Sequence, residues 1–148
     1  MKLTKRVLYN RAKPVTFASV FQNQQLADHM VRFMNKEQAL GLAAPQIGLA
    51  KRVFVMNVDG RERRCFNPEI IESSEILEGF DEGCLSFPGE SCTLTRPSAV
   101  TVRYQDADGT WNEDRLAGLE ARCYQHELDH LDGITMWDRH KEQNAEQS

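Results

Sequence analysis

The segment His126-Glu127-Leu128-Asp129-His130 constrains this chain more than any other feature, because it places two histidines four residues apart. In an α-helix, residues at that spacing lie on one face, so both imidazoles are able to bind one metal ion. Glu127 lies beside a predicted ligand without being one, a position that suits a proton shuttle for a metal-activated water. The pattern therefore predicts a helix that carries a catalytic metal site, with a third protein ligand elsewhere in the chain.

Length and composition indicate one ordinary globular domain. The chain has 148 residues, of which 41% are apolar and 27% charged, so it is long enough to bury a core. Its net charge of −4 argues against an extended phosphate-binding surface and against a DNA partner. No apolar run has the length of a signal peptide or of the ~18 residues of a membrane span. We therefore expect a single catalytic domain over residues 1–148, located in the cytoplasm and without a membrane partner.

Apolar periodicity predicts two helices. Apolar residues recur at helical spacing over Gln22–Glu37, and the motif helix is expected over Leu116–Asp132, ended by Gly133. Leu40–Gly48 is too rich in Gly, Ala and Pro for a regular element and predicts a close-packed loop. Residues 138–148 are almost wholly polar, which predicts a frayed tail.

Runs of β-branched and alternating apolar residues predict four strands. They cover Arg52–Val58, Arg64–Ile71, Glu75–Phe80 and Val100–Tyr104. The expected fold is α+β, with short antiparallel β-strands packed around a central metal-bearing helix and one further N-terminal helix.

The third ligand is predicted upstream of the motif. Downstream, the position of a third histidine six residues after His130 is occupied by Met136, and the last glutamates lie in the polar tail. Upstream, Cys84 lies in Glu82-Gly83-Cys84-Leu85-Ser86, where Gly83 lets the backbone approach a metal closely. The backbone N–H of Leu85 is then able to face a developing negative charge. A thiolate with two imidazoles suits Fe²⁺, Co²⁺, Ni²⁺ or Zn²⁺.

Two alternatives stay open for the cysteines. Cys84 would be an ordinary buried thiol, or Cys92 would replace it as the ligand. Disulfides are not expected, since cytosolic thiols stay reduced, so the remaining cysteines are interpreted as small buried hydrophobes.

Among the nearby carboxylates, Asp129 and Asp132 are interpreted as solvated helix-face groups, and Glu82 as the partner of Arg96 or Arg103 in an ion pair.

Three motifs together resemble the peptide deformylase family, whose enzymes remove the N-formyl group from the initiator methionine of new polypeptides. They are Gly41-Leu42-Ala43-Ala44-Pro45-Gln46, Glu82-Gly83-Cys84-Leu85-Ser86 and Gln125-His126-Glu127-Leu128-Asp129-His130. The resemblance covers roughly residues 5 to 137. Each motif alone is moderately specific, whereas their combination in this order and spacing is very specific.

The resemblance implies a role for each motif residue. Cys84, His126 and His130 bind one divalent metal ion, expected to be Fe²⁺ in the cell, with Zn²⁺, Ni²⁺ or Co²⁺ as substitutes. Metal-bound hydroxide attacks the formyl carbon and Glu127 shuttles the proton. The side-chain amide of Gln46 and the backbone N–H of Leu85 stabilise the oxyanion.

The implied substrates are N-formyl-methionyl nascent peptides. Gly41 presents its backbone to the peptide, which binds as an extra strand. The residues expected to line the site for the methionine side chain are Leu40, Leu85, Leu119, the stem of Arg122 and Cys123, and Gly83 is a further residue expected to contact the substrate. Core packing explains the apolar members of this set equally well. Transient contact with the ribosome is a further implication, although the clustered basic tail that would dock on ribosomal RNA is missing.

The chain departs from the family pattern at two points. Ala39 stands where the first motif usually has a further glycine, and the chain ends 15 residues after Gly133 instead of continuing as a long C-terminal helix. The shortened form is similar to compact deformylases encoded by bacteriophages. Two other classes compete with this interpretation: a zinc endopeptidase in which Cys84 has no role, and a non-catalytic relative, which would be expected to lose Glu127 or a ligand.

Overall fold

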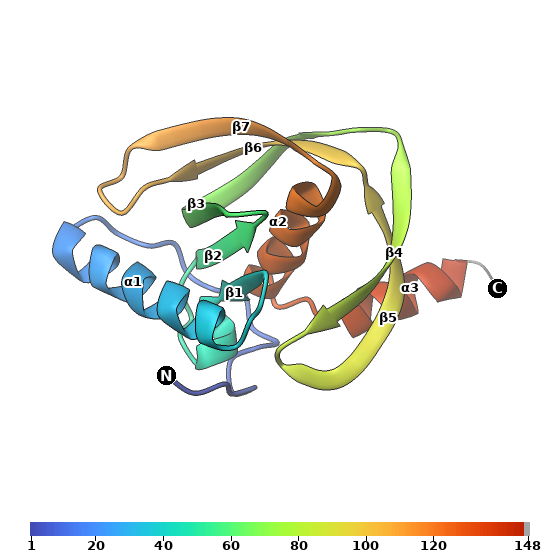
Figure 1. Cartoon of the computed structure of the whole chain (residues 1–148), viewed down its shortest axis with the longest axis horizontal. Coiled ribbons are helices and arrows are strands. Elements are labelled where there is room, and N and C mark those ends of the chain that lie inside the picture. The colour runs from blue at the N-terminus through green and yellow to red at the C-terminus, as the bar shows by residue number, and fades with distance from the viewer. Residues whose placement is uncertain (147–148) are drawn as a thin grey trace.

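The computed structural model describes residues 1–146 and has an α+β fold with two antiparallel sheets (Figure 1). The helices are α1 (Val20–Lys36), the short 3₁₀ helix η1 (Ala44–Ile47), α2 (Gly118–Leu131) and α3 (Met136–Glu146). The strands are β1 (Gly41–Ala43), β2 (Val53–Val58), β3 (Arg61–Ser73), β4 (Leu77–Cys84), β5 (Phe87–Pro97), β6 (Ala99–Gln105) and β7 (Trp111–Ala117). None of the described helices is long and apolar enough to cross a membrane.

The larger sheet has the strand order β1-β2-β3-β6-β7, and β4 and β5 form a separate hairpin. In Figure 1 the larger sheet curves around α2, while α1 lies on its other side. The predicted α+β class and the central helix surrounded by antiparallel strands are confirmed.

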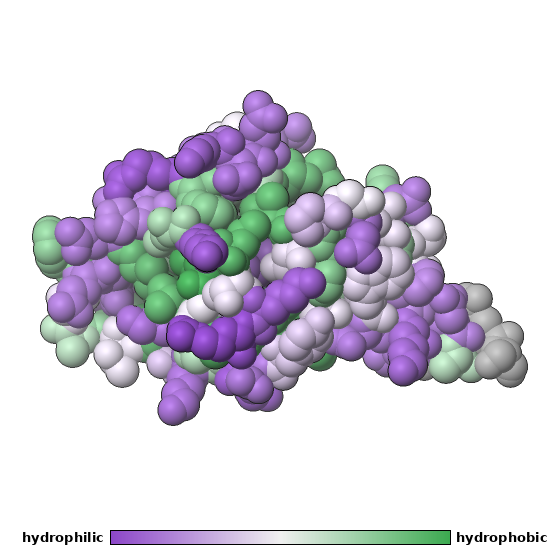
Figure 2. Space-filling view, turned by 90° about the horizontal axis from the view of Figure 1, so that it is seen from below, coloured by the Kyte–Doolittle hydropathy of each residue, from purple (hydrophilic) through white to green (hydrophobic). Residues whose placement is uncertain are grey.

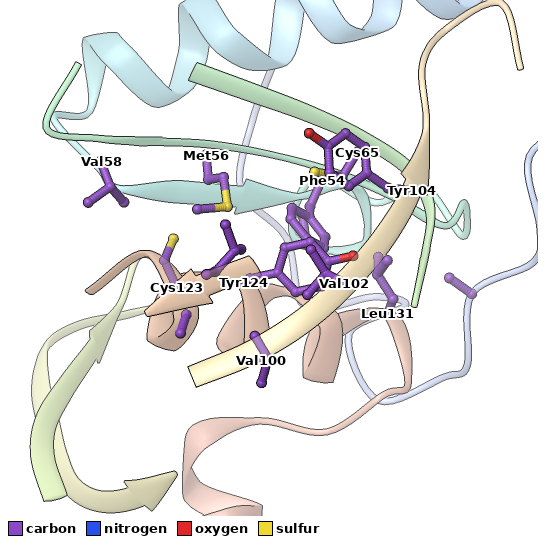
Figure 3. Packing of buried hydrophobic residues seen from close by; sticks show 14 residues of the cluster. Phe54, Met56, Val58, Cys65, Val100, Val102, Tyr104, Cys123, Tyr124 and Leu131 are labelled. Carbon is purple, nitrogen blue, oxygen red and sulfur yellow. The ribbon is translucent and has the colours of Figure 1, made fainter. Parts of the chain in front are cut away.

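Strand β2 lies at the centre of the core because both of its faces are apolar. Phe54 and Met56 point toward α2, whereas Val53 and Val55 belong to the cluster on the α1 side. This is the period-2 alternation of a strand that is covered on both faces. Figure 3 shows the α2 side, where Tyr124 packs edge-on against Phe54 with 4.9 Å between ring centroids.

Tyr124 also fixes α2 by its polar end. Its hydroxyl donates to the backbone oxygens of Glu69 and Arg103 at 3.1 and 3.2 Å, and its ring is fully buried. A buried tyrosine with a satisfied hydroxyl is held both by apolar packing and by hydrogen bonding. Helix α2 is therefore held firmly against the sheet, as a helix that carries a reactive site must be.

The sequence predicted the first helix and four of the strands closely. Ser19 caps α1 by accepting from the backbone N–H of Gln22, so the helix begins two residues earlier than predicted. The predicted strands overlap β2, β3, β4 and β6. The segment Leu40–Gly48 is not a loop throughout, since it contains β1 and η1.

The prediction of a frayed tail over residues 138–148 was wrong for its described part, because residues 136–146 form α3. Met136 is buried against β5, and Thr135 and Asp138 hydrogen-bond to each other across the first turn of the helix. Arg139 binds Asp129 of α2 at 2.9 Å. The apolar side chains of Met136 and Trp137 and the ion pair between Arg139 and Asp129 therefore hold a helix whose remaining residues are mostly polar. Residues 147 and 148 lie outside the described residues.

Candidate active site

Cys84, His126 and His130 come together at the end of β4 and on one face of α2. Their ligand atoms all lie within 4.8 Å of one another, and Sγ of Cys84 is 3.3 Å from Nε2 of His130. Two ligands of one tetrahedral ion, with metal–sulfur and metal–nitrogen distances of ~2.3 and ~2.0 Å, lie about 3.5 Å apart. The donor set and its spacing therefore fit a divalent metal ion. The register shift between Gly83 and Cys84 is the local irregularity that ends the regular pairing of β4 beside the cluster.

The rival cysteine lies elsewhere. Cys92 is buried between β5 and α3, where its thiol donates to the backbone oxygen of Met136 at 3.6 Å. The described cysteines are all free, and Cys65, Cys92 and Cys123 are buried, as predicted for small hydrophobes.

A buried carboxylate holds His126 in place. Nδ1 of His126 donates to Glu82 at 2.8 Å, which leaves Nε2 free to face the cluster. Glu82 also accepts from Arg96 at 2.6 Å and from Arg122 at 2.5 Å. Burial by itself raises the pKa of Glu82, but hydrogen bonds from His126 and Arg96 outweigh burial and hold that pKa well below its usual range. The predicted pairing with Arg96 is confirmed.

The alternative partner of Glu82 is engaged elsewhere, since Arg103 pairs with Glu69 at 3.5 Å. The prediction that Asp129 is solvated was wrong, because its carboxylate is buried between Arg96 and Arg139, each at 2.9 Å. Asp132 pairs with Arg52, also at 2.9 Å, and its side chain stays a third exposed. The carboxylates near the motif are therefore parts of ion pairs that tie α2 to neighbouring segments.

Glu127 is buried, and its Oε2 atom has no hydrogen-bond partner among the described residues. Burial raises the pKa of Glu127 to about 7, and attraction to His126 offsets this only in part. A Cβ atom on Gly41 would lie 2.9 Å from Oε1 of Glu127 and 3.0 Å from Sγ of Cys123. Only glycine therefore lets β1 run this close to the carboxylate.

Gln46 is fixed at both ends of its amide. Its Oε1 accepts from the backbone N–H of Ala43 at 2.9 Å, and this assigns the other end of the amide as the donor. Nε2 donates to Oγ of Ser86 at 3.1 Å and lies 3.4 Å from Sγ of Cys84. The amide N–H group is thus held beside the three-ligand cluster. Ser86 is a contact that sequence reasoning missed, although it stands within the quoted motif.

A cleft of about 510 Å³ opens beside this cluster. The predicted residues Leu40, Gly41, Gly83, Leu85, Leu119, Arg122 and Cys123 all line it, together with Gln46, His126 and Glu127. Leu40 and Leu119 stand at its exposed side, 47% and 44% accessible. The guanidinium of Arg122 turns away to bind Glu82 and to stack 4.7 Å from the ring centroid of Phe80. The arrangement is that of a hydrolytic site with an apolar cleft next to it.

Comparison with known proteins agrees with this arrangement. The profile of the family described as "Polypeptide deformylase" matches residues 1–146. A peptide deformylase from Thermotoga neapolitana is 43% identical over 135 residues, which cover 91% of this chain and 82% of the relative. The crystal structure of a peptide deformylase from Thermotoga maritima superposes with a TM-score of 0.89 at 39% identity and covers 93% of this chain and 95% of that one. The crystal structure of a probable peptide deformylase from Synechococcus phage S-SSM7 superposes with a TM-score of 0.87 at 36% identity. It covers 93% of this chain and 98% of the phage chain.

The fold, the three motifs and these similarities agree on one class, the deformylating amide hydrolases. The chain belongs to the polypeptide deformylase family and is an enzyme of that family.

Proposed function

We propose that this enzyme removes the formyl group from the N-terminal formyl-methionine of newly made polypeptides and releases formate. The observation that carries the proposal is the position of three ligand atoms within 4.8 Å of one another, beside the unpartnered carboxylate oxygen of Glu127. Cys84, His126 and His130 would hold one divalent ion, with Fe²⁺ proposed in the cell and Zn²⁺, Ni²⁺ or Co²⁺ as substitutes. When bound, the ion acts as a Lewis acid that polarises the formyl carbonyl and lowers the pKa of water.

Glu127 moves the proton in this proposal. Its Oε2 accepts a proton from the attacking water and later donates it to the nitrogen of the leaving amine. Three features support this role: the carboxylate is buried, one oxygen has no partner among the described residues, and β1 passes next to it at Gly41.

The oxyanion is stabilised by two N–H donors. The amide of Gln46 is oriented by the Ala43 N–H, so its Nε2 needs no reorientation to donate at the moment of reaction. The backbone N–H of Leu85 is the second donor, next in sequence to Cys84. One such donor contributes on the order of 3 kcal/mol to transition-state stabilisation.

The peptide binds beside β1, which pairs only with β2 among the described strands and therefore has one edge available. Gly41 presents the backbone to which the peptide hydrogen-bonds. The methionine side chain enters the cleft between Leu40, Gly83, Leu119, Cys123 and the stem of Arg122. Such nascent chains are made in the cytoplasm, where we place the enzyme.

Release of formate from formyl-Met-Ala-Ser by anaerobically prepared protein tests the reaction. We expect turnover that is lost after chelation and restored by Fe²⁺. A Cys84→Ser variant separates the deformylase from a general zinc endopeptidase, since only the former loses bound metal together with activity. A folded, metal-loaded protein that releases no formate would refute the proposal.

A further inference from the structure

The net charge of −4 conceals a strong asymmetry along the chain. Residues 1–52 contain nine Lys and Arg against two Asp and Glu, a net charge of +7, whereas residues 53–148 contain nine against twenty, a net charge of −11. Of the two acidic groups in the first part, Asp28 is neutralised by Arg64 and Glu37 lines the active-site cleft. The first third of the chain is therefore a concentrated source of positive charge.

The fold brings several of these cations close to one another. The segment over residues 4–13 runs beside the segment over residues 46–51: Thr4 N–H donates to the oxygen of Gln46, and Arg6 donates to the oxygen of Gly48. Further along, Lys13 pairs with Lys51 in an isolated β-bridge. Two lysines from distant parts of the sequence are thereby placed next to each other. Figure 1 shows the N-terminal segment along the lower edge of the molecule, together with η1 and the C-terminal end of α1.

Helix α1 extends this surface. His29, Arg32 and Lys36 share one face of the helix and line a shallow hollow together with Met1 and Phe33. We define the basic face as the exposed side chains of Arg6, Arg11, Lys13, Arg32, Lys36 and Lys51. Figure 2 views the molecule from this lower side, where strongly hydrophilic side chains (purple) project around a hydrophobic area (green).

The cations of the basic face are not neutralised within the protein. Among the described residues, no ion pair uses any of the six. By contrast, most arginines in residues 53–148 form ion pairs with carboxylates. Arg63 binds Asp114 and Glu120, and Arg96 binds Glu82 and Asp129. A cluster of like charges that the fold leaves without counter-charges attracts a polyanion.

We propose that the basic face binds the phosphate backbone of RNA and so brings the active-site cleft to the place where new polypeptides emerge. The choice of RNA over other polyanions rests on the proposed function, because a nascent chain appears next to an RNA-rich machine. A lipid surface fits less well, since the apolar residues Met30 and Met34 beside Arg32 and Lys36 are buried, and the exposed Phe21 lies at the opposite end of α1 from these two cations. Leu3 and Glu37 line the cleft and are close in sequence to Arg6 and Lys36, so the basic face borders the cleft.

Binding of a fluorescein-labelled 20-base-pair RNA duplex, measured between 50 and 200 mM KCl, tests the proposal. Log K is expected to fall linearly with log salt, because phosphate binding releases counterions. Two double variants, Arg32→Glu with Lys36→Glu and Lys13→Glu with Lys51→Glu, should each weaken binding at least ten-fold and lower the salt slope by about 2. The matched control, Arg61→Glu with Arg115→Glu, makes the same change in net charge on β3 and β7 and should leave binding within two-fold.

The outcomes separate this proposal from the proposed function. Formate release from formyl-Met-Ala-Ser should be unchanged in all three variants, since none of these residues lines the cleft. An equal loss of RNA binding in the control would mean that only net charge matters and would overturn the assignment of the face. Tighter binding to anionic vesicles or to a DNA duplex of the same sequence would overturn the choice of RNA. Absence of deformylase activity in the wild type would refute the proposed function. The RNA-binding measurement would still test the basic face, because it does not depend on activity.

Discussion

The carboxylate of Glu82 accepts a hydrogen bond from Nδ1 of His126 over 2.8 Å, and this contact links α2 to β4. Because a carboxylate with a depressed pKa only accepts, the contact fixes the proton of His126 on Nδ1. The opposite nitrogen is then the one that faces Cys84 and His130.

Replacing Glu82 by Gln should reduce metal affinity by ~10- to 100-fold, since the imidazole of His126 loses its charged partner. Metal content after equilibrium dialysis against graded chelator measures the loss. Glu78→Gln is the control, because Glu78 lies on the same strand with an exposed side chain. Equal metal retention in both variants would contradict the orienting role of Glu82.

Gly41→Ala should reduce kcat/KM on the order of 100-fold, since the new methyl group would lie only 2.9 Å from Oε1 of Glu127 and 3.0 Å from Sγ of Cys123 and would displace them. Gly79→Ala on β4 serves as the matched change, because a Cβ there meets only Thr95 at 3.8 Å. Steady-state formate release compares the two variants. If Gly41→Ala retained wild-type activity, the close approach of β1 to Glu127 would be irrelevant to catalysis.

Gln46→Glu keeps an oxygen that accepts from Ala43 N–H but removes the amide donor. We expect kcat to fall by ~10²- to 10³-fold with little change in KM, because the lost hydrogen bond is made mainly in the transition state. Ser86→Ala, which removes only the present acceptor of that amide, should retain most of the activity. A rise in KM with kcat unchanged, or equal effects of the two changes, would contradict an oxyanion role.

Helix α3 leads to a prediction about stability. Arg139→Ala should lower the free energy of unfolding by about 1 kcal/mol, because Asp129 keeps Arg96 but loses a partner that is itself a third exposed. Urea unfolding of this variant beside Lys141→Ala, an exposed neighbour on the same helix, measures the difference. Identical midpoints would show that α3 is not held through this ion pair.

Helix α2, which carries two of the candidate metal ligands, could be predicted from the sequence because its signal is local. The four-residue spacing of His126 and His130 fixes their common face, and the three motifs led to Cys84 and Gln46 as partners. The helix over residues 20–36 was likewise visible in its apolar period. In these places, local pattern and tertiary packing agree.

Features that depend on distant residues could not be predicted in this way. The segment of α3 is too polar to suggest a packed helix, and its anchors, Cys92 and Asp129, lie far away in sequence. Asp129 looks solvated on a helix face until α3 and β5 cover it. Strand β7 is an edge strand with one buried residue, Leu116, so it lacks the apolar alternation that identifies β6. The total charge likewise gave no sign of the basic face, since it averages over both parts of the chain.

Formate release by anaerobically prepared Glu127→Gln protein, measured together with its metal content, tests the central claim most directly. We expect the variant to fold, to hold metal as the wild type does and to release formate at least 10³-fold more slowly, because only the proton carrier is lost. Wild-type turnover in the metal-loaded variant would contradict the role of Glu127 and with it the proposed mechanism.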